Sequence, residues 1–333
     1  MNVREEILNI TLPIYDNELD FLRLSGAAKE YKRFLTELAS ADLDQMKAKD
    51  SIVLDHGKAI GTYWAAMCID DLLRTRQFMR GIDQAVEDKL KTESRILHIL
   101  YAGTGPFAAL VLPLLFKYQT EKIRYTFIEI NPLSFELLHN VISKLKLDGV
   151  QINLICADAT EYKIDLTNQP DIIISETMQA GLSSEPQVPI FLNLMKQAKE
   201  EVTFIPEKIE LFIGLKKERI PAEELQIDDY VKFRKIFDLS KTAVSERITK
   251  TQAGKINFEQ KKTIIELQDQ KGFDSIYLLT EVQVYKEISL RTNESGVTMP
   301  KQIFSIPVTD HKPITIESRY SISTEPKLEY NIR

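Results

Sequence analysis

Two glutamates share one loop in the stretch Asp171–Glu185, which reads DIIISETMQAGLSSE. The apolar run predicts a buried strand that ends at Glu176, and the loop containing Gly181 returns the chain to Glu185 nine residues later. Two facing carboxylates repel each other and raise one pKa unless a cation lies between them. A planar guanidinium offers its donors in a rigid fork and matches two carboxylates, whereas an ammonium needs only one. The pair therefore predicts a site for a guanidinium group.

Glycines and further acids mark the ends of the preceding predicted strands. In ILYAGTGPFAA, Gly103 and Gly105 stand where a strand should turn into a helix, and glycine lets the main chain approach a ligand at the helix N-terminus. Glu129 in RYTFIEIN follows 24 residues after Gly105, and such a carboxylate can hydrogen-bond both ribose hydroxyls of an adenosine. INLICA leads into Asp158 and Ala159, where an adenine amino group could be held. Together these strand ends predict an adenosine-containing cofactor.

These residues alone allow either of two cofactors, a nicotinamide dinucleotide or S-adenosylmethionine. Against a dinucleotide, the second mononucleotide-binding half is missing, and Ala108 stands where the third glycine of the fingerprint belongs. The structural alternative is a glycine turn chosen for geometry and a solvated acid at a strand end.

Three regions must position these residues. Residues 1–94 carry apolar residues at helical spacing, and residues 95–206 alternate short β-rich runs with helical ones such as PFAALVLPLLFKY. That alternation predicts an α/β fold with a doubly wound, Rossmann-like parallel sheet. Residues 207–333 show alternating strands that predict an antiparallel, barrel-like β domain, interrupted by a helical arm at about 221–241.

Composition narrows the class of protein. The 333 residues, 44% of them hydrophobic, can bury a sizeable core, and the net charge of −6 argues against a nucleic-acid partner while leaving room for a cationic substrate. No apolar run approaches the length of a membrane helix, and MNVREEILNI lacks a signal-like segment, so we expect a cytoplasmic protein without a membrane partner. Cys68 and Cys156 have no metal-like spacing, and we interpret both as reduced core thiols without a metal site.

The acid loop resembles the double-glutamate loop of the protein arginine methyltransferases, with Glu176, Met178 and Glu185 at matching positions. Upstream, DDLLRTRQF resembles a helical motif of that family, and the match implies that Arg74 binds the carboxylate of the methionine moiety of S-adenosylmethionine. The glycine motif and Glu129 in FIEIN match the cofactor motifs of the family. The resemblance implies a Rossmann-like methyltransferase that uses S-adenosyl-L-methionine.

The resemblance continues beyond the acid loop. FIPEKIELFI resembles the crossing of that family into its β-barrel, and KFRKIFDLSK falls where the dimerisation arm lies, which implies a homodimer. The β-barrel of that family carries a Thr-His-Trp motif, which this chain lacks. The fragment TDHK, which contains His311, is the nearest substitute. An arm helix would expose apolar residues that a second copy should cover: Tyr230, Val231, Phe233, Ile236 and Phe237.

The predicted reaction is N-methylation of a guanidinium group, with free arginine or an arginine-containing peptide as substrate. Glu176 and Glu185 would localise positive charge on the nitrogens they bind, and Met178 lies against the sulfonium or packs the loop. One alternative is a small-molecule amine or amino-acid methyltransferase of the same fold, which needs a counter-charge for a substrate carboxylate. The other is a non-enzymatic protein that keeps the sheet and uses its arm and barrel for assembly.

Overall fold

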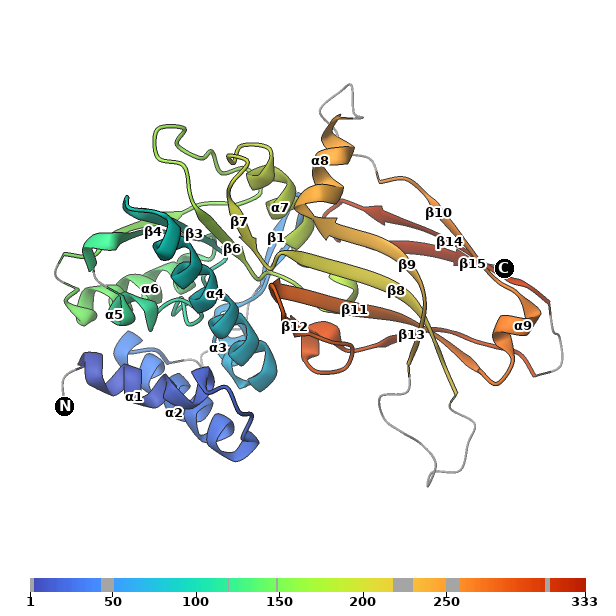
Figure 1. The fold of residues 1–333 in the computed structure, drawn as a ribbon, viewed down its shortest axis with the longest axis horizontal. Helices are drawn as coiled ribbons and strands as arrows, with labels where there is room; N and C mark the ends of the chain where they lie inside the picture. Colours follow the sequence, from blue (N-terminus) through green and yellow to red (C-terminus); the bar gives the residue numbers. More distant parts are fainter. Residues whose placement is uncertain are drawn as a thin grey trace.

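The computed structural model describes residues 3–42, 51–118, 120–147, 149–217, 230–249, 258–308 and 312–333. The molecule is elongated, with an α/β body at one end and an antiparallel β body at the other (Figure 1). The N-terminus lies beside the helices of the α/β body, and the C-terminus lies at the far side of the β body. His311 falls outside the described residues.

The N-terminal part is mainly helical, as predicted. Its helices are α1 (Val3–Tyr15), α2 (Phe21–Ala39), α3 (Thr62–Met67) and α4 (Leu72–Thr92). The Asp20 side chain caps α2 by accepting from two backbone N–H groups, which explains where that helix begins. The hairpin of β1 (Ile52–Leu54) and β2 (Gly57–Ala59) corrects the all-helical expectation, and Gly57, which directly follows its two-residue turn, has a positive φ.

The central sheet is parallel and doubly wound, as predicted. Its strand order is β5-β4-β3-β6-β7, so the chain moves outward from β3 in one direction and then returns to the other side. The carboxyl ends of β3, β4 and β6 meet around the point where the direction reverses. The strands are β3 (Leu97–Ala102), β4 (Ile123–Glu129), β5 (Gln151–Cys156), β6 (Ile172–Ser175) and β7 (Thr203–Ile205).

The helices between these strands are less regular than the sequence suggests. α6 (Pro132–Leu145) is capped by Asn131 and α7 (Gln187–Met195) follows the acid loop. The run PFAALVLPLLFKY forms turns and only a short helix, α5 (Leu114–Lys117). Ala108 adopts a φ of 47°, a left-handed conformation that a continuous helix cannot include. The helix N-terminus expected at Gly105 is therefore absent.

The C-terminal part is antiparallel, as predicted. One sheet has the order β12-β11-β8-β9 with β13 paired to β11, and a second has the order β10-β14-β15. The rings of Phe237, Phe258 and Tyr320 pack against one another and join the two sheets. The strands are β8 (Lys208–Lys216), β9 (Val231–Ser240), β10 (Lys261–Ile265), β11 (Ser275–Tyr285), β12 (Ile288–Leu290), β13 (Lys301–Ser305), β14 (Ile314–Ser321) and β15 (Lys327–Ile332), with helices α8 (Lys241–Thr249) and α9 (Leu267–Gln270).

The predicted arm helix at about 221–241 is wrong over its second half, which forms strand β9. Two register shifts against β8 leave Phe233 and Ile236 as extra residues, so apolar residues fall three apart as they do in a helix. Ile236 and Phe237 are buried within this chain, so they offer no apolar surface to a second copy, whereas Val231 stays 49% exposed. Residues 218–229 lie outside the described part of the chain.

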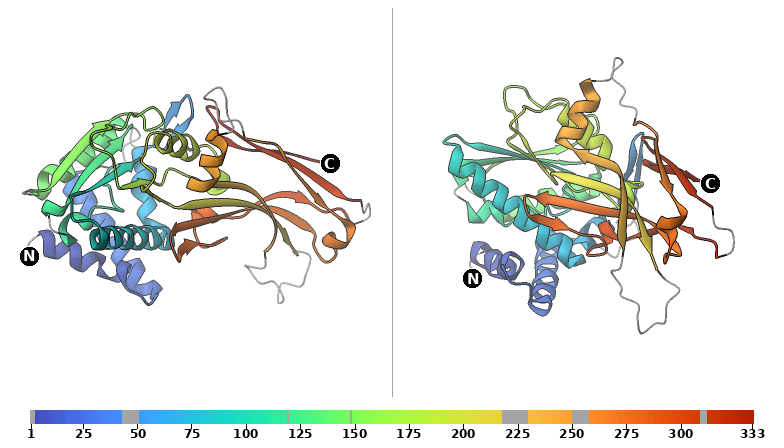
Figure 2. Two further views of the ribbon diagram at one scale, coloured as in Figure 1. Left: turned by 45° about the horizontal axis from the view of Figure 1, so that its top comes forward. Right: turned by 45° about the vertical axis from the view of Figure 1, so that its right-hand side comes forward.

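Helix α4 joins the two bodies, and Figure 2 shows it running from the α/β body towards the β sheet. Gly81 allows the contact, because a Cβ there would lie 2.6 Å from Val284 Cγ1. Gln77 Nε2 donates to the Ser289 carbonyl at 3.0 Å on the same interface. The start of α4, which carries Arg74, is thus fixed relative to both bodies.

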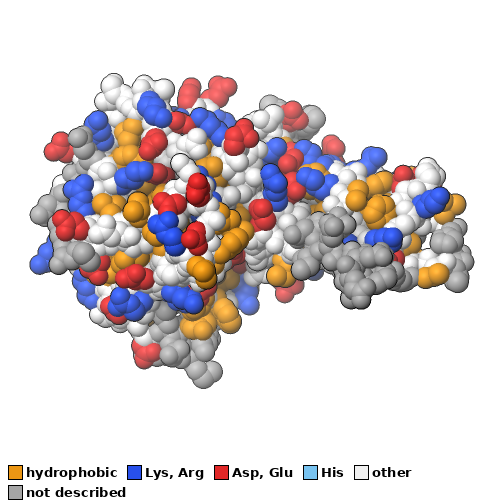
Figure 3. Space-filling model, turned by 60° about the horizontal axis from the view of Figure 1, so that its bottom comes forward, with side chains coloured by type: hydrophobic (Ala, Val, Ile, Leu, Met, Phe, Trp, Pro, Cys, Tyr) orange, Lys and Arg blue, Asp and Glu red, His pale blue; other side chains and the backbone are white. Residues whose placement is uncertain are grey.

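Charges are interspersed on the surface. On the face shown in Figure 3, Lys and Arg side chains alternate with Asp and Glu side chains. Within the described residues, no helix combines the length and the apolarity needed to cross a bilayer.

A buried acid secures the strand that carries the acid loop. The Asp171 side chain is 1% exposed, and Arg95 binds its two oxygens at 2.9 and 2.6 Å. Lys199 contacts the same carboxylate, and the His98 N–H donates to it at 2.8 Å. Burial alone would raise the pKa of Asp171, but these partners lower it to about 2.

We expect Asp171→Asn to lower the free energy of unfolding at neutral pH by about 2–3 kcal/mol, because two cations lose their shared anion while both still reach water. The folded-state pKa lies below the ordinary value of 3.8, so the stabilisation is complete above about pH 4 and is lost as the pH falls towards 2. Urea unfolding at neutral and acidic pH measures both effects. The exposed Asp165→Asn is the control, and equal losses from the two variants would contradict the assignment.

Candidate active site

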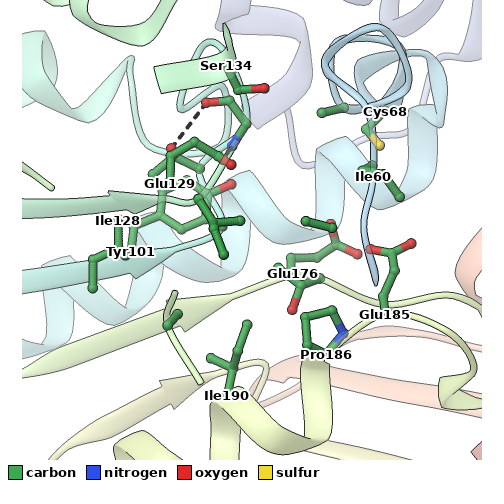
Figure 4. Close-up of a pocket in the computed structure, with 18 of the residues that line it drawn as sticks. Ile60, Cys68, Tyr101, Ile128, Glu129, Ser134, Glu176, Glu185, Pro186 and Ile190 are labelled. Carbon is green, nitrogen blue, oxygen red and sulfur yellow. Dashed lines mark hydrogen bonds between the residues drawn. The ribbon is translucent and has the colours of Figure 1, made fainter. Parts of the chain in front are cut away.

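The sequence-predicted site residues lie together. Figure 4 shows Glu176 and Glu185 on one side of a cavity and Glu129 on the other. The cavity lies at the carboxyl edge of the central sheet, and Tyr101 and Ile128 contribute to its walls. All nine predicted residues line it: Arg74, Gly103, Gly105, Glu129, Asp158, Ala159, Glu176, Met178 and Glu185.

Glu129 is the acid at the end of β4, and it is buried. Its Oε2 accepts from Gly105 N at 2.7 Å and its Oε1 accepts from Asn131 N at 2.8 Å. Burial raises the pKa of Glu129, while these backbone hydrogen bonds oppose the shift. A carboxylate has about four lone-pair sites, so Glu129 retains acceptor capacity for a ligand hydroxyl.

Gly103 is required for a different reason from the one inferred from the sequence. Its φ of 76° is left-handed, and its N–H donates to the Ile128 carbonyl at 2.9 Å. A Cβ at this position would lie 2.2 Å from Thr177 Cγ2, next to Glu176 in the acid loop. Glycine therefore lets the chain turn at the end of β3 in close contact with that loop.

We expect Gly103→Ala to lower the free energy of unfolding by at least about 1 kcal/mol more than Gly272→Ala does. Both glycines have left-handed φ values, 76° and 86°, but nothing lies within 4 Å of a Cβ on Gly272. The difference between the variants therefore isolates the contact with Thr177. Chemical denaturation of both variants is the measurement. Equal losses would show that only the backbone conformation requires Gly103.

Glu176, in the acid loop, and Arg74, on α4, form an ion pair that lines the cavity. The Glu176 side chain is 1% exposed, and its Oε2 contacts Arg74 Nη2. Its other oxygen, Oε1, is buried without a hydrogen-bond partner among the described residues. Burial would lower the pKa of Arg74, but Cys68, Glu185 and Asp71 raise it, so the guanidinium stays charged. The guanidinium of Arg74 thus contacts Glu176 and interacts with the charge of Glu185.

Glu185 closes the acid loop and is also buried. Burial raises its pKa, while the charge of Arg74 and a hydrogen bond from Gln179 oppose the shift. Met178 is 3% exposed and lies between the two acids in the chain. A carboxylate that is costly to ionise alone gains most from a bound cation.

Several residues that hold the loop were not identified from the sequence. Gln187 Oε1 accepts from Thr177 N at 2.9 Å, where the loop begins. From the β body, Thr280 Oγ1 accepts from Gly181 N at 2.8 Å and Tyr320 donates to the Leu182 carbonyl at 2.7 Å. The signal for Gln187 was its position two residues after Glu185, whereas nothing near Thr280 or Tyr320 indicates a role in the loop.

The interpretation of both cysteines as core thiols is wrong. Cys156 is exposed, because β5 is an edge strand of the central sheet. Cys68 is half-buried and lines the cavity beside Arg74. Among the described residues, no group of three or more His, Cys, Asp or Glu side chains is arranged to hold a metal.

A second groove adjoins the cavity on the side of the acid loop, and we call it the outer groove. It shares Arg74, Met178 and Glu185 with the cavity. Trp64 and Met299, which are 56% and 58% exposed, contribute apolar surface. Its further polar lining comes from Lys58, Asp71, Gln179 and Lys301. The two hollows therefore meet at Glu185 and Arg74, and Glu176 lines the cavity.

A doubly wound parallel sheet with a cavity at its carboxyl edge, joined to antiparallel β sheets, is a Rossmann-like α/β fold with an added β body. More specifically, the chain has the fold of the protein arginine methyltransferases. Protein arginine methyltransferase 10 of Arabidopsis thaliana superposes with a TM-score of 0.57 at 12% identity, over 80% of this chain and 90% of that one.

Two further solved structures are similar. PRMT6 gives a TM-score of 0.54 at 12% identity, over 80% of this chain and 97% of the other. The PRMT1 enzyme–prozyme heterotetrameric complex of Trypanosoma brucei, solved with AdoHcy, gives 0.52 at 11% identity, over 80% of this chain and 91% of that one. No protein-family model and no curated protein sequence matches this chain.

Proposed function

We propose that this protein is an S-adenosylmethionine-dependent methyltransferase that methylates a guanidinium nitrogen, most simply that of arginine. The observation that carries the proposal is the acid pair, in which Glu176 lines the cavity and Glu185 lies where the cavity meets the outer groove. Both carboxylates are buried, and Glu176 Oε1 has no partner among the described residues. A buried carboxylate oxygen without a donor is costly, so the site is suited to a ligand that brings donors with it.

The cavity residues fit S-adenosylmethionine. Glu129 has free lone pairs for ribose hydroxyls, and Asp158 and Ala159 at the end of β5 would hold the adenine. Gly103 and Gly105 bring the main chain to the cavity wall. Arg74 would bind the methionine carboxylate, which requires it to share or leave its contact with Glu176. When bound, S-adenosylmethionine supplies a methyl on a cationic sulfur, which passes to the substrate nitrogen with loss of one proton and leaves a neutral thioether.

The acids would orient and activate the substrate. Glu176 and Glu185 bind two nitrogens of a guanidinium and concentrate its positive charge there, which leaves electron density on the third nitrogen. Glu185 would accept the proton, because burial raises its pKa. The buried Met178 fills the loop between the acids and helps to exclude water.

The second candidate is a small-molecule amine or amino-acid methyltransferase of the same fold. The lysines Lys58 and Lys301 in the outer groove favour it, because they could bind the carboxylate of an amino-acid substrate. A non-enzymatic assembly protein is disfavoured, because it gains nothing from a buried carboxylate oxygen without a partner.

Homodimer formation and a cytoplasmic location stay predictions. One similar structure, the Trypanosoma brucei complex, is a heterotetramer. Measurement of the mass in solution decides the assembly of this chain.

The activity is tested by incubating the full chain and methyl-labelled S-adenosylmethionine with free arginine, with an arginine-containing peptide and with simple amines. Label in a guanidino compound supports the proposal. Label only in amines would favour the second candidate, and label in none of them would contradict the proposal.

We expect Glu129→Ala to weaken S-adenosylmethionine binding by about 1.5–3 kcal/mol, because hydrogen bonds from ribose hydroxyls to a charged group are lost. Calorimetric titration measures the dissociation constant. Glu136→Ala, at an exposed position on α6, is the control and should bind as the unaltered protein does. An unchanged constant for Glu129→Ala would mean that this acid only holds the backbone amides of Gly105 and Asn131.

A further inference from the structure

The charges in the outer groove differ from those expected for a cationic peptide. Among the residues that the structure describes, two acids, Asp71 and Glu185, line it together with three bases, Lys58, Arg74 and Lys301. A groove for an arginine-rich peptide should be acidic beyond the acid pair, because each additional arginine brings another cation. The bases in this groove act against such a substrate.

Two of these five charges are already used within the protein. Asp71 caps α4 and accepts from Ser295 Oγ at 2.7 Å and from Gly296 N at 2.9 Å. Arg74 is paired with Glu176. Among the described residues, the charges available to a ligand in the outer groove are therefore one carboxylate, that of Glu185, and the ammonium groups of Lys58 and Lys301.

Of the two lysines, Lys301 is the one whose ammonium group contacts the acid loop. It begins β13, and its Nζ donates to Ser183 Oγ at 2.8 Å, two residues before Glu185. A Cβ built on Gly181 would lie 3.7 Å from the same Nζ, so the ammonium lies across the loop. Among the described residues, no carboxylate lies within ion-pair distance of it, and partial burial lowers its pKa. In contrast, the β9 lysines Lys232 and Lys235 both have carboxylate partners.

We propose that Lys301 binds the carboxylate of the substrate, and that the substrate is a guanidino acid whose α-carboxylate is free. The inference rests on the proposed function. In this arrangement the acid pair binds the guanidinium and Lys301 binds the opposite end of the same molecule. Each charge of the substrate then meets its opposite, which is the pattern that gives specificity in a polar site.

Two sources carry this chemistry: free arginine, and a peptide that ends in arginine. Free arginine is the source we favour, because a peptide would also have to pass Lys58 on the hairpin β1–β2. An arginine inside a peptide has no α-carboxylate, and its neighbours would leave Lys301 without an anion. The exposed Trp64 and Met299 supply apolar surface for the methylene chain between the two charged ends.

The test compares substrates that differ in the carboxylate alone. The full chain is assayed with S-adenosylmethionine and four probes: L-arginine, its decarboxylated analogue agmatine, a peptide with a C-terminal arginine, and the same peptide amidated at its C-terminus. We expect kcat/KM for arginine to exceed that for agmatine by at least about 10-fold, the size of one charge-assisted hydrogen bond. The free-acid peptide should exceed the amidated peptide in the same direction but react more slowly than arginine.

Variants assign this preference to Lys301. Lys301→Met should lower kcat/KM for arginine by at least about 10-fold, mainly through KM, and leave agmatine within about twofold. Lys301→Arg should restore most of the loss, because it keeps the charge. Lys262→Met, at an exposed lysine on β10, is the matched control. A loss that is equal for arginine and agmatine would overturn the role, because it would show a merely structural effect.

The outcome separates this inference from the proposed function. Methylation of the amidated peptide at a rate equal to or above that of arginine would support a guanidinium methyltransferase and overturn carboxylate recognition. Methylation of none of the four probes would overturn both. A preference for the free-acid peptide over arginine would keep the role of Lys301 and replace the source of the carboxylate.

Discussion

Replacing Glu185 by Gln is expected to lower turnover by at least about 10²-fold while leaving the dissociation constant of S-adenosylmethionine within about twofold. The amide keeps the shape of the side chain but loses the charge that concentrates positive charge on the substrate nitrogens. Because that charge acts most strongly as the methyl is transferred, the loss should appear in kcat. Single-turnover kinetics with labelled S-adenosylmethionine, together with calorimetry for the cofactor, measure the two quantities separately.

Glu136→Gln on α6 is the control for this variant, because it makes the same chemical change at an exposed position. Glu176→Gln should also reduce turnover, and the double variant should lose far less than the sum of the two single losses, since the acids act as one unit. A near-normal rate for Glu185→Gln would show that the two acids do not act together on the guanidinium of the substrate.

Replacing Arg74 by Met is expected to lower the free energy of unfolding by about 3–5 kcal/mol. The change leaves the Glu176 carboxylate buried at 1% side-chain exposure, with neither of its oxygens paired. The loss should exceed that from Asp171→Asn, because the cations around Asp171 reach water and the Glu176 carboxylate does not. Urea unfolding of the cofactor-free protein at neutral pH is the measurement.

A double variant provides the control for Arg74. Arg74→Met combined with Glu176→Leu removes both charges, so it should recover most of the stability that Arg74→Met loses, although it cannot be active. Should Arg74→Met alone unfold within about 1 kcal/mol of the unaltered protein, the ion pair contributes little and Arg74 is available to a ligand without cost.

The sheet and its edge could be predicted because they depend on local pattern. DIIIS and RYTFIEI are short apolar runs with β-branched residues, and such strands pair in a parallel sheet when helical runs separate them. The carboxyl ends of parallel strands share one edge, so placing Glu129 and Glu176 at strand ends was enough to place them at one cavity.

Other elements could not be predicted, because their local pattern suggests the wrong structure. The bulges at Phe233 and Ile236 give β9 a helical spacing of apolar residues. The left-handed Ala108 interrupts a run of helix formers, and no propensity indicates that it should. Cys156 was assigned to the core because its strand is apolar, but β5 lies at the sheet edge and has one open side.

The supports of the site were missed because they come from distant parts of the chain. Thr280 and Tyr320 contact the acid loop only after the β body has folded against it. Lys301 reaches Ser183 across 118 residues of sequence. The reason for Gly103 was also hidden, since its contact with Thr177 depends on how β3 and β6 pair. Sequence spacing identifies the groups that bear chemistry, whereas tertiary packing identifies the groups that hold them.

The position of the transferred methyl tests the central claim most directly. The full chain is incubated with L-arginine and S-adenosylmethionine that carries a trideuterated methyl group, and the product is fragmented by tandem mass spectrometry. If Glu176 and Glu185 together bind the guanidinium, the deuterated methyl should lie on a guanidino nitrogen, and Glu185→Gln should lower the yield of this product by at least about 10²-fold while it still binds S-adenosylmethionine. A deuterated methyl on the α-amino nitrogen, or an unchanged yield from Glu185→Gln, would contradict the account.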